Sequence, residues 1–220
     1  MKQYNNIVVT GALGQDGIIL SKILIKNKFR VYGIVRKTPN YKNKIKNVIY
    51  KSFNLKSSKT VKKNLDKINP LCLVHLGTDN PNFYEVNNKS FYKNNLLITK
   101  NLINYFSKYK PGNKLIIIGS SQMYQKKLKK INLKTPFRPI NYYAKFRVDS
   151  FNYMLKSKQK FKSNIVMAIL FNHDSAFRKR KFLLPRLIKL IRNKNFKELN
   201  KIYKENISGD YSHAEDICNA

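Results

Sequence analysis

The feature that most constrains the fold is a set of three glycines near the amino terminus, spaced three residues apart. Gly11, Gly14 and Gly17 follow the apolar run IVV and precede a segment with helical periodicity. Glycine lets a backbone turn sharply after a strand and approach a pyrophosphate, whose charge then lies at the helix amino terminus. Because the run directly follows a first strand, it predicts a dinucleotide-binding βαβ unit.

Segments rich in valine and isoleucine alternate with amphipathic segments along the 220 residues. This alternation predicts βαβ units and an α/β, Rossmann-type fold with a doubly wound parallel sheet. We expect an NAD(P)-binding Rossmann domain over 1–171 and the beginning of a small C-terminal substrate domain over 172–220. The stretch 125–140, which is polar and contains prolines, is predicted to be a loop. Predicted strands cover 4–10, 30–36, 47–53, 71–76, 113–119 and 164–171, and predicted helices cover 16–27, 58–68, 88–109, 142–160 and 182–194.

The chain carries 45 lysines and arginines against 11 acidic residues, which gives a net charge of +34. Such a positive charge makes nucleic acid one class of partner to consider. The lysines, however, are spread along the whole chain, and no zinc-finger spacing, RNA-binding aromatic motif or compact basic arm occurs. We therefore expect small anions such as nucleotides, and not nucleic acid, to bind.

Membrane, secreted and metal-binding proteins are disfavoured. No apolar stretch approaches the roughly 18–20 residues of a membrane span, and the first apolar run ends too soon for a signal peptide. We expect a cytoplasmic protein in which Cys72 and Cys218 are reduced thiols. His75, His173 and His213 share no metal-ligand spacing, so no metal site is expected.

The end of the second predicted strand bears on the cofactor. It reads Val35-Arg36-Lys37, where an NAD site usually offers a carboxylate to the ribose hydroxyl. A cation there suits the 2′-phosphate of NADP, so we predict NADP with Arg36 as its main contact. NAD remains the alternative, since a chain so rich in lysine can carry basic residues there by chance.

Five segments resemble the GDP-mannose 4,6-dehydratases, a family within the extended short-chain dehydrogenases/reductases, or NAD-dependent epimerases/dehydratases. TGALGQDG and VYGIVRK resemble its cofactor turn and second strand, and SSQMY resembles its Ser/Thr-Ser-Glu-Leu-Tyr segment. LFNHDSAFRKRKF resembles its Asn-His-Glu-Ser segment, and YSHAEDICNA resembles its Trp-Gly-His-Ala-x-Asp segment. The resemblance spans nearly all of the chain.

The resemblance implies a nucleotide sugar, a GDP-hexose, as substrate. In that family the sugar C4 hydroxyl is oxidised, water leaves across C5 and C6, and the hydride returns at C6. A tyrosine takes the hydroxyl proton, and a lysine four residues later lowers the pKa of that tyrosine and holds the nicotinamide ribose. A serine or threonine donates a hydrogen bond to the oxygen of the C4 hydroxyl, and a glutamate takes the proton from C5. The family also implies a homodimer or tetramer built on helices 88–109 and 142–160.

The resemblance places the catalytic tyrosine on Tyr143 and the lysine position on Arg147. Tyr142 has a phenylalanine four residues later, and Lys145 has the wrong spacing for an i,i+4 pair with either tyrosine. The resemblance places the hydroxyl that donates to the sugar oxygen on Ser120, and Gln122 stands at the position of the glutamate.

The resemblance also implies a set of binding residues. Asn172 and Lys181 are expected to contact the substrate, although Asn172 can equally cap a loop. The basic amphipathic stretch 181–193 is of a kind that can lie on membranes, but in this fold we expect it beside the substrate. The expected cofactor contacts are Gly11, Gly14, Gln15, Asp16, Gly17, Arg36, Asn54, Leu55, Leu76, Tyr143 and Arg147.

Two departures from the family pattern keep other functions open. Arg147 keeps the positive charge but replaces a compact ammonium with a planar fork. Gln122 has no useful basicity, so it cannot take the C5 proton. The family also continues past the segment at Asp216, so we expect this chain to be truncated at its C-terminal end. A nucleotide-sugar epimerase, a C4 oxidoreductase and a non-catalytic nucleotide-binding relic remain alternatives.

Overall fold

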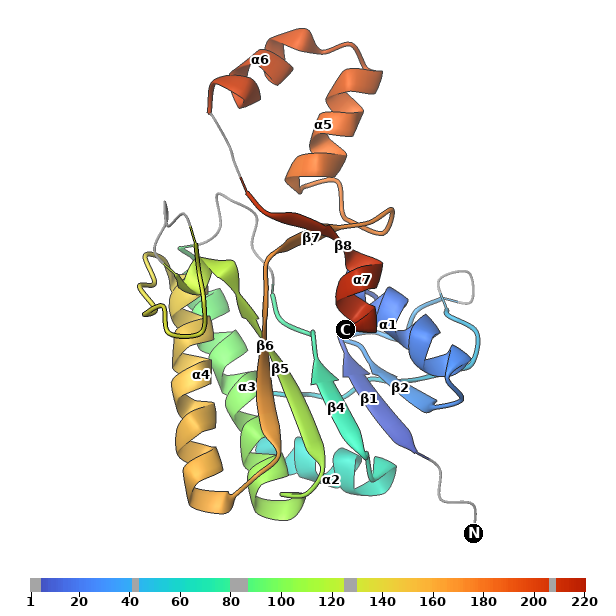
Figure 1. Cartoon of the computed structure of the whole chain (residues 1–220). Coiled ribbons are helices and arrows are strands. Elements are labelled where there is room, and N and C mark those ends of the chain that lie inside the picture. Colours follow the sequence, from blue (N-terminus) through green and yellow to red (C-terminus); the bar gives the residue numbers. More distant parts are fainter. Residues whose placement is uncertain (1–4, 41–43, 80–86, 125–129, 206–208) are drawn as a thin grey trace.

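One parallel sheet organises the computed structural model, which describes residues 5–40, 44–79, 87–124, 130–205 and 209–220. Its six strands lie in the order β3-β2-β1-β4-β5-β6. From β1 the chain first adds β2 and β3 on one side. It then crosses back and adds β4, β5 and β6 on the other side of β1 (Figure 1). This is the strand order of a doubly wound dinucleotide-binding sheet. The predicted α/β, Rossmann-type fold is confirmed.

The helices and strands predicted before residue 172 are all present, and their ends differ from the predicted ones by a few residues. Tyr4, the predicted start of the first strand, and residues 125–129 of the predicted loop lie outside the described residues. The strands are β1 Asn6–Thr10, β2 Arg30–Ile34, β3 Val48–Lys51, β4 Cys72–His75, β5 Lys114–Ser120 and β6 Ile165–Leu170. The helices are α1 Gln15–Lys26, α2 Ser58–Ile68, α3 Lys89–Tyr109 and α4 Tyr142–Phe161.

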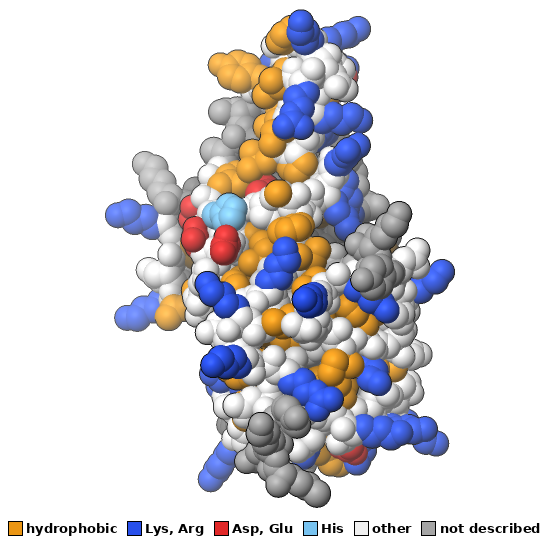
Figure 2. Space-filling view, turned by 90° about the vertical axis from the view of Figure 1, so that its right-hand side faces the viewer, with side chains coloured by type: hydrophobic (Ala, Val, Ile, Leu, Met, Phe, Trp, Pro, Cys, Tyr) orange, Lys and Arg blue, Asp and Glu red, His pale blue; other side chains and the backbone are white. Residues whose placement is uncertain are grey.

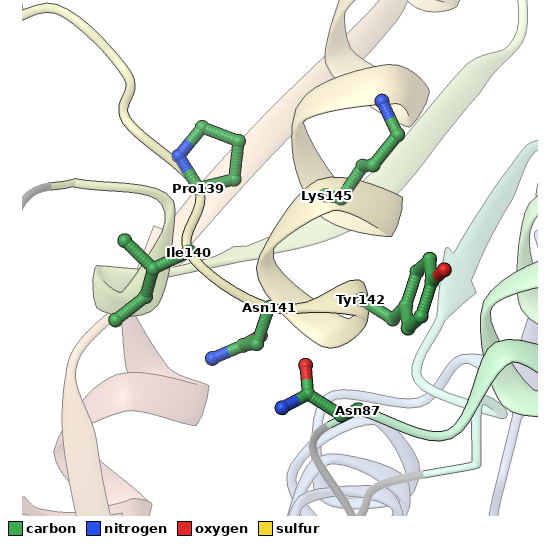
Figure 3. Close-up of a pocket in the computed structure, with 6 residues that line it drawn as sticks. All are labelled: Asn87, Pro139, Ile140, Asn141, Tyr142 and Lys145. Carbon is green, nitrogen blue, oxygen red and sulfur yellow. The ribbon is translucent and has the colours of Figure 1, made fainter.

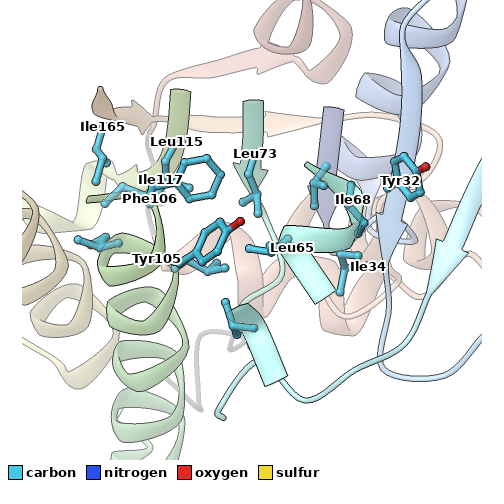
Figure 4. Packing of buried hydrophobic residues seen from close by; sticks show 14 of the residues in the cluster. Tyr32, Ile34, Leu65, Ile68, Leu73, Tyr105, Phe106, Leu115, Ile117 and Ile165 are labelled. Atoms are coloured by element: carbon cyan, nitrogen blue, oxygen red, sulfur yellow. The ribbon is translucent and has the colours of Figure 1, made fainter. Parts of the chain in front are cut away.

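Helices α2, α3 and α4 cover one face of the sheet, because their apolar residues recur at helical spacing. In α2 these are Val61, Leu65 and Ile68, which are buried together with Leu73 of β4 and Leu115 of β5 (Figure 4). Full burial of such a side chain contributes about 1.5–3 kcal/mol. This face therefore carries the main core.

Helix α1 covers the opposite face over β1 and β2. Its half-buried Leu20 and Leu24 pack against Ile7 and Val9 of β1 and Val31 of β2. These strand residues alternate with those that face the main core, as the two-residue period of a strand requires. The sheet is thus apolar on both faces at its centre, which is typical of parallel sheets.

The chain after β6 lies along and beyond the carboxyl ends of the strands (Figure 1). Strand β7, Asn172–Asp174, pairs in parallel with β8, Tyr211–His213. Between them come α5, Leu183–Arg192, which confirms the predicted helix at 182–194, and α6, Phe196–Lys204. Helix α7, Ala214–Asn219, returns to pack against α1. We did not predict β7, α6, β8 or α7, and the domain boundary at residue 172 stays a prediction.

Basic side chains are not confined to one region of the surface. Figure 2 shows lysines and arginines distributed over the face that it draws, between apolar and neutral atoms. This agrees with the even spread of lysine along the sequence.

Around the glycine turn after β1, backbone packs more tightly than around any other glycine of the described residues. Gly11 has a φ of 70°, a left-handed conformation that favours glycine. A Cβ on Gly17 would lie 2.3 Å from the carbonyl oxygen of Gly11. Both positions therefore need glycine for reasons of shape.

Gly17→Ala is expected to lower the free energy of unfolding by about 1–3 kcal/mol or more, since the clash is with backbone that cannot yield freely. Thermal or urea unfolding would measure the loss. Gly112→Ala is the matched control, because nothing lies within 4 Å of a Cβ at Gly112; it should change stability by about 1 kcal/mol or less. Equal stability of the two variants would contradict the assigned packing.

Candidate active site

The candidate site lies where β1 and β4 end side by side. Gly11 follows β1 and Gly77 follows β4, and a Cβ on Gly77 would lie 2.8 Å from the amide nitrogen of Gly11. The order of strands reverses between β1 and β4, and ligands of such sheets bind at this crevice. Close backbone packing brings the loops after both strands to one place.

The first turn of α1 can receive an anion from this crevice. The helix begins at Gln15, and its N-cap residue Gly14 has no side chain to occupy the helix end. The first amide groups of a helix have no partner within it and carry partial positive charge. The predicted cofactor contacts Gly11, Gly14 and Gly17 thus surround a position suited to a pyrophosphate.

Tyr143 and Arg147 lie together at the start of α4. Nη2 of Arg147 lies 3.4 Å from the Tyr143 hydroxyl and donates to Oγ1 of Thr78 at 3.2 Å. Nη1 donates to the carbonyl of Ile118 at 2.6 Å. The guanidinium also lies over the Phe146 ring, 4.6 Å from its centroid. Arg147 is buried, with 5% exposure, and these contacts fix its charge beneath Tyr143 between the ends of β4 and β5.

The neighbouring residues Tyr142 and Lys145 belong to another face of α4. The ring of Tyr142 packs against Tyr92 of α3 at 5.8 Å between centroids, and Lys145 forms an ion pair with Asp149 at 3.5 Å. A shallow cavity of about 250 Å³ opens on this face (Figure 3). The cavity is lined by Asn87, Pro139, Ile140, Asn141, Tyr142 and Lys145. Since neither Tyr143 nor Arg147 lines it, we do not identify it with the crevice.

Ser120 is the last residue of β5 and the N-cap of a short 3₁₀ turn, Ser121–Met123, which contains Gln122. The hydroxyl of Ser120 accepts a hydrogen bond from the amide nitrogen of Gln122 at 3.2 Å. The side chain of Gln122 is exposed and accepts from Nδ2 of Asn141 at 3.3 Å. Asn141 in turn caps α4, with its Oδ1 accepting from the amide nitrogen of Ala144. Gln122 is therefore linked to the helix that carries Tyr143.

The other predicted cofactor contacts line the carboxyl edge of the sheet. Asn54 is exposed after β3, and Leu55 and Leu76 are half-buried after β3 and β4. Arg36, after β2, is 93% exposed and forms an ion pair with Asp79 at 3.5 Å. Asp79 was not among the predicted residues.

A buried polar chain behind the crevice was also missed by sequence reasoning. Nδ1 of His75 lies 2.8 Å from Oγ1 of Thr10, and its Nε2 lies 3.2 Å from Oγ1 of Thr99. The Thr99 hydroxyl donates to the carbonyl of Asn95, so Nε2 of His75 is the donor and Nδ1 the acceptor. Burial, together with the charge of Arg147, lowers the pKa of His75 to about 3. His75 is therefore neutral.

The side chains of Gln15 and Asp16 contact the C-terminal segment. Oδ1 of Asp16 pairs with Nε2 of His173 at 3.1 Å, and Oε1 of Gln15 accepts from the Ser175 hydroxyl at 3.1 Å. Nδ1 of His173 also faces an acceptor, the carbonyl of Phe171 at 2.8 Å. Both ring nitrogens of His173 must therefore carry protons to form these bonds. If Gln15 and Asp16 contact a cofactor, as predicted, their backbone amides are the groups left to do so.

The charges of this pair stabilise each other. Burial favours the neutral form of both groups, but hydrogen bonds and attraction between them outweigh it. The pKa of Asp16 is accordingly lowered, and the pKa of His173 is raised. The only sequence signal of this contact was that both residues lie in segments that resemble one family.

The two predicted substrate contacts lie above the edge of the sheet. Asn172 is exposed at the start of β7, and Lys181 is exposed two residues before α5. Between them Arg178 pairs with Asp174 at 3.0 Å and lies over the ring of Phe182. The predicted substrate and cofactor residues therefore border the same end of the sheet, but their roles stay predictions.

The structure also bears on metal centres and membrane spans. Across the part of the chain that the structure describes, no three His, Cys, Asp or Glu side chains gather as metal ligands would. Within the same ranges, no helix has the length and apolar character needed to cross a membrane.

Comparisons with known proteins agree with this geometry. The family model of the NAD-dependent epimerase/dehydratase family matches residues 7–220. A search of curated proteins found no match.

Solved structures share the fold at low sequence identity. A UDP-glucose 4-epimerase from Brucella ovis in complex with NAD is 16% identical, with a TM-score of 0.81 over 98% of this chain and 71% of that chain. A UDP-glucuronic acid 4-epimerase from Bacillus cereus, in complex with UDP-glucuronic acid and NAD, is 18% identical over 97% and 70%, with a TM-score of 0.78. A dTDP-glucose 4,6-dehydratase from Bacillus anthracis in complex with NAD is 15% identical over 97% and 69%, with a TM-score of 0.77.

The Asp16–His173 pair predicts a pH-dependent stability. Because the folded pKa of His173 is raised above 6.5, its stabilisation is complete below that value and is lost as pH rises through the folded pKa. Because the folded pKa of Asp16 is lowered below 3.8, its stabilisation is complete above that value and is lost as pH falls further. The difference in unfolding free energy between the protein and its Asp16→Asn variant should thus be largest between pH 3.8 and 6.5.

Urea unfolding of both proteins at about pH 5.5 and about pH 8.5 would measure this difference. Asp66→Asn is the control, because Asp66 pairs with Lys62, whose pKa is raised and which stays charged at both values. A difference for Asp16→Asn that is equal at the two pH values would show that His173 does not carry the charge assigned to it.

Proposed function

The chain belongs to the NAD-dependent epimerase/dehydratase family, and on that basis we propose that it is a nucleotide-sugar 4,6-dehydratase. It would oxidise C4 of the sugar with NADP, after which water leaves across C5 and C6. The observation that carries the proposal is the contact of the Tyr143 hydroxyl with the buried guanidinium of Arg147, 3.4 Å away. This pair lies at the carboxyl edge of the sheet, beside the glycine turn. A tyrosine next to a fixed cation is suited to accept a proton from a sugar hydroxyl.

The residues at the edge of the sheet fit a dinucleotide. Gly11 and Gly17 let the backbone pack tightly into the turn before α1, and we propose that a pyrophosphate lies at the amino terminus of this helix. Nε of Arg147 is buried and has no hydrogen-bond acceptor among the described residues. A buried donor of this kind is costly unless an acceptor arrives. A hydroxyl of the nicotinamide ribose is the acceptor that we propose for it.

Each catalytic residue has a proposed role. Tyr143 takes the proton of the C4 hydroxyl, and the charge of Arg147 stabilises the phenolate that must form. Ser120 donates a hydrogen bond to the same sugar oxygen. When bound, the nicotinamide supplies the group that accepts hydride from C4 and later returns it.

For the substrate we propose a GDP-hexose, held in part by Asn172 and Lys181. The resemblance of LFNHDS and the basic residues after it to the corresponding dehydratase segment supports this choice. We also propose a homodimer through α3 and α4. Leu97 of α3 and Leu155 of α4 are 44% and 46% exposed, which would suit such a contact.

Gln122 favours a second candidate within the same family, a C4 epimerase or oxidoreductase. Its amide is hydrogen-bonded to the amide of Asn141 and has no basicity with which to remove the C5 proton. Oxidation at C4 does not need that proton transfer, whereas elimination of water does. The two candidates therefore share the step at Tyr143 and differ in whether a proton is then removed from C5.

The shared step can be followed with GDP-mannose deuterated at C4. We expect the purified protein to transfer the label to NADP, and Tyr143→Phe to slow this transfer by about 10²- to 10⁴-fold, the usual effect of losing a positioned base. Tyr142→Phe is the matched control and should transfer label at the original rate, since its ring packs on Tyr92. Label transfer that survives Tyr143→Phe would show that the base lies elsewhere. Binding of NADP without transfer from any nucleotide sugar would favour a non-catalytic relic.

The elimination step is tested by Gln122→Glu. A glutamate can keep the hydrogen bond from Asn141 and also supply a base. We expect the variant to form the 4-keto-6-deoxy product, seen by mass, at least about 10²-fold faster than the original protein. Gln159→Glu adds the same charge at the far end of α4, where Gln159 is exposed, and should have no effect. If the original protein already eliminates water as fast as Gln122→Glu, Gln122 does not limit the reaction.

A further inference from the structure

Asp79 meets Arg36 across the end of β1. Arg36 follows β2 and Asp79 follows β4, the two strands that flank β1 in the sheet. Nη1 of Arg36 lies 3.5 Å from Oδ1 of Asp79, and their side chains are 93% and 34% exposed. The adenosine ribose of a dinucleotide lies beside the end of β2 in such folds. The pair thus lies where the 2′-hydroxyl of NAD or the 2′-phosphate of NADP is expected to bind.

The backbone of Asp79 is held in position from the core. Oδ1 of Asn95 accepts from the Asp79 amide nitrogen, and Nδ2 of Asn95 donates to the Asp79 carbonyl, both at 2.9 Å. Asn95 is 2% exposed, and its own carbonyl accepts from Thr99, which contacts His75. The loop that carries Asp79 is therefore fixed by a buried hydrogen-bond chain, whereas Arg36 reaches it from solvent.

We propose that Asp79 sets the preference between the two dinucleotides by supplying, from the loop after β4, the carboxylate that the end of β2 lacks. The inference rests on the proposed dinucleotide-binding function. A carboxylate accepts a hydrogen bond from the 2′-hydroxyl of NAD but repels the 2′-phosphate of NADP. It also neutralises Arg36, the cation that would hold this phosphate. Asp79 thereby keeps NAD usable at a site whose second strand ends in basic residues.

The expected effect is modest, because both groups face solvent and exposed ion pairs are weak. Removing the charge of Asp79 should raise the preference for NADPH over NADH by roughly 3- to 10-fold. The change should come mainly from tighter NADPH binding, and it should shrink as salt screens the charges.

Titration of the fluorescence of NADPH and of NADH with the full chain would give both Kd values. Asp79→Asn keeps the shape of the side chain and removes its charge. Asp66→Asn removes the same charge on α2, where Asp66 pairs with Lys62 instead. We expect the ratio of the two Kd values to shift toward NADPH in Asp79→Asn and to stay unchanged in Asp66→Asn.

Other outcomes overturn the inference in distinguishable ways. An unchanged ratio in Asp79→Asn, or equal weakening of both dinucleotides, would mean that Asp79 only shapes its loop. An equal shift in Asp66→Asn would assign the effect to net charge. If the original protein binds neither dinucleotide, the proposed function fails as well.

Discussion

The whole arrangement depends on how closely the backbone segments approach one another where β1 and β4 end. Gly17 and Gly77 each pack against Gly11 at distances that leave no room for a Cβ. This packing directs the first turn of α1 toward the crevice and brings the loop after β4 against it. The same loop carries Thr78, which contacts Arg147, and Asp79, which contacts Arg36. One steric constraint therefore gathers the residues on which both proposals rest.

Burial and partners give the two histidines near the crevice different protonation states. His75 is enclosed next to Arg147 and is neutral, since its pKa is lowered to about 3. His173 has Asp16 as a partner, and its pKa is raised despite burial. The charged pair joins the cofactor turn to the C-terminal segment, together with the Gln15–Ser175 hydrogen bond and the packing of α7 on α1.

Of the residues proposed to be catalytic, Tyr143 and Arg147 are suited to redox chemistry, whereas Gln122 is not suited to elimination. Arg147 is held by carbonyl and hydroxyl acceptors from β5 and the loop after β4, and its planar fork also contacts Tyr143, the contact that the resemblance expects of a lysine. Gln122, which the resemblance places where a glutamate base would lie, has no basicity with which to remove a proton. The family match and the fold therefore support dinucleotide-dependent chemistry more directly than they support a particular product.

The sequence alone determined the strands and helices before residue 172 and the glycine turn, because each depends on neighbours within a few residues. The resemblance selected Tyr143 and Arg147, and their spacing of four residues on one helix then implied that they meet. Period and spacing report such local geometry. The pairing of β7 with β8, the contact of Asp16 with His173 157 residues away and the meeting of Arg36 with Asp79 were not predictable in this way. Strands of three residues carry no readable period, and long-range contacts exist only once the strand order has brought distant loops to one edge. Tertiary structure alone decided them.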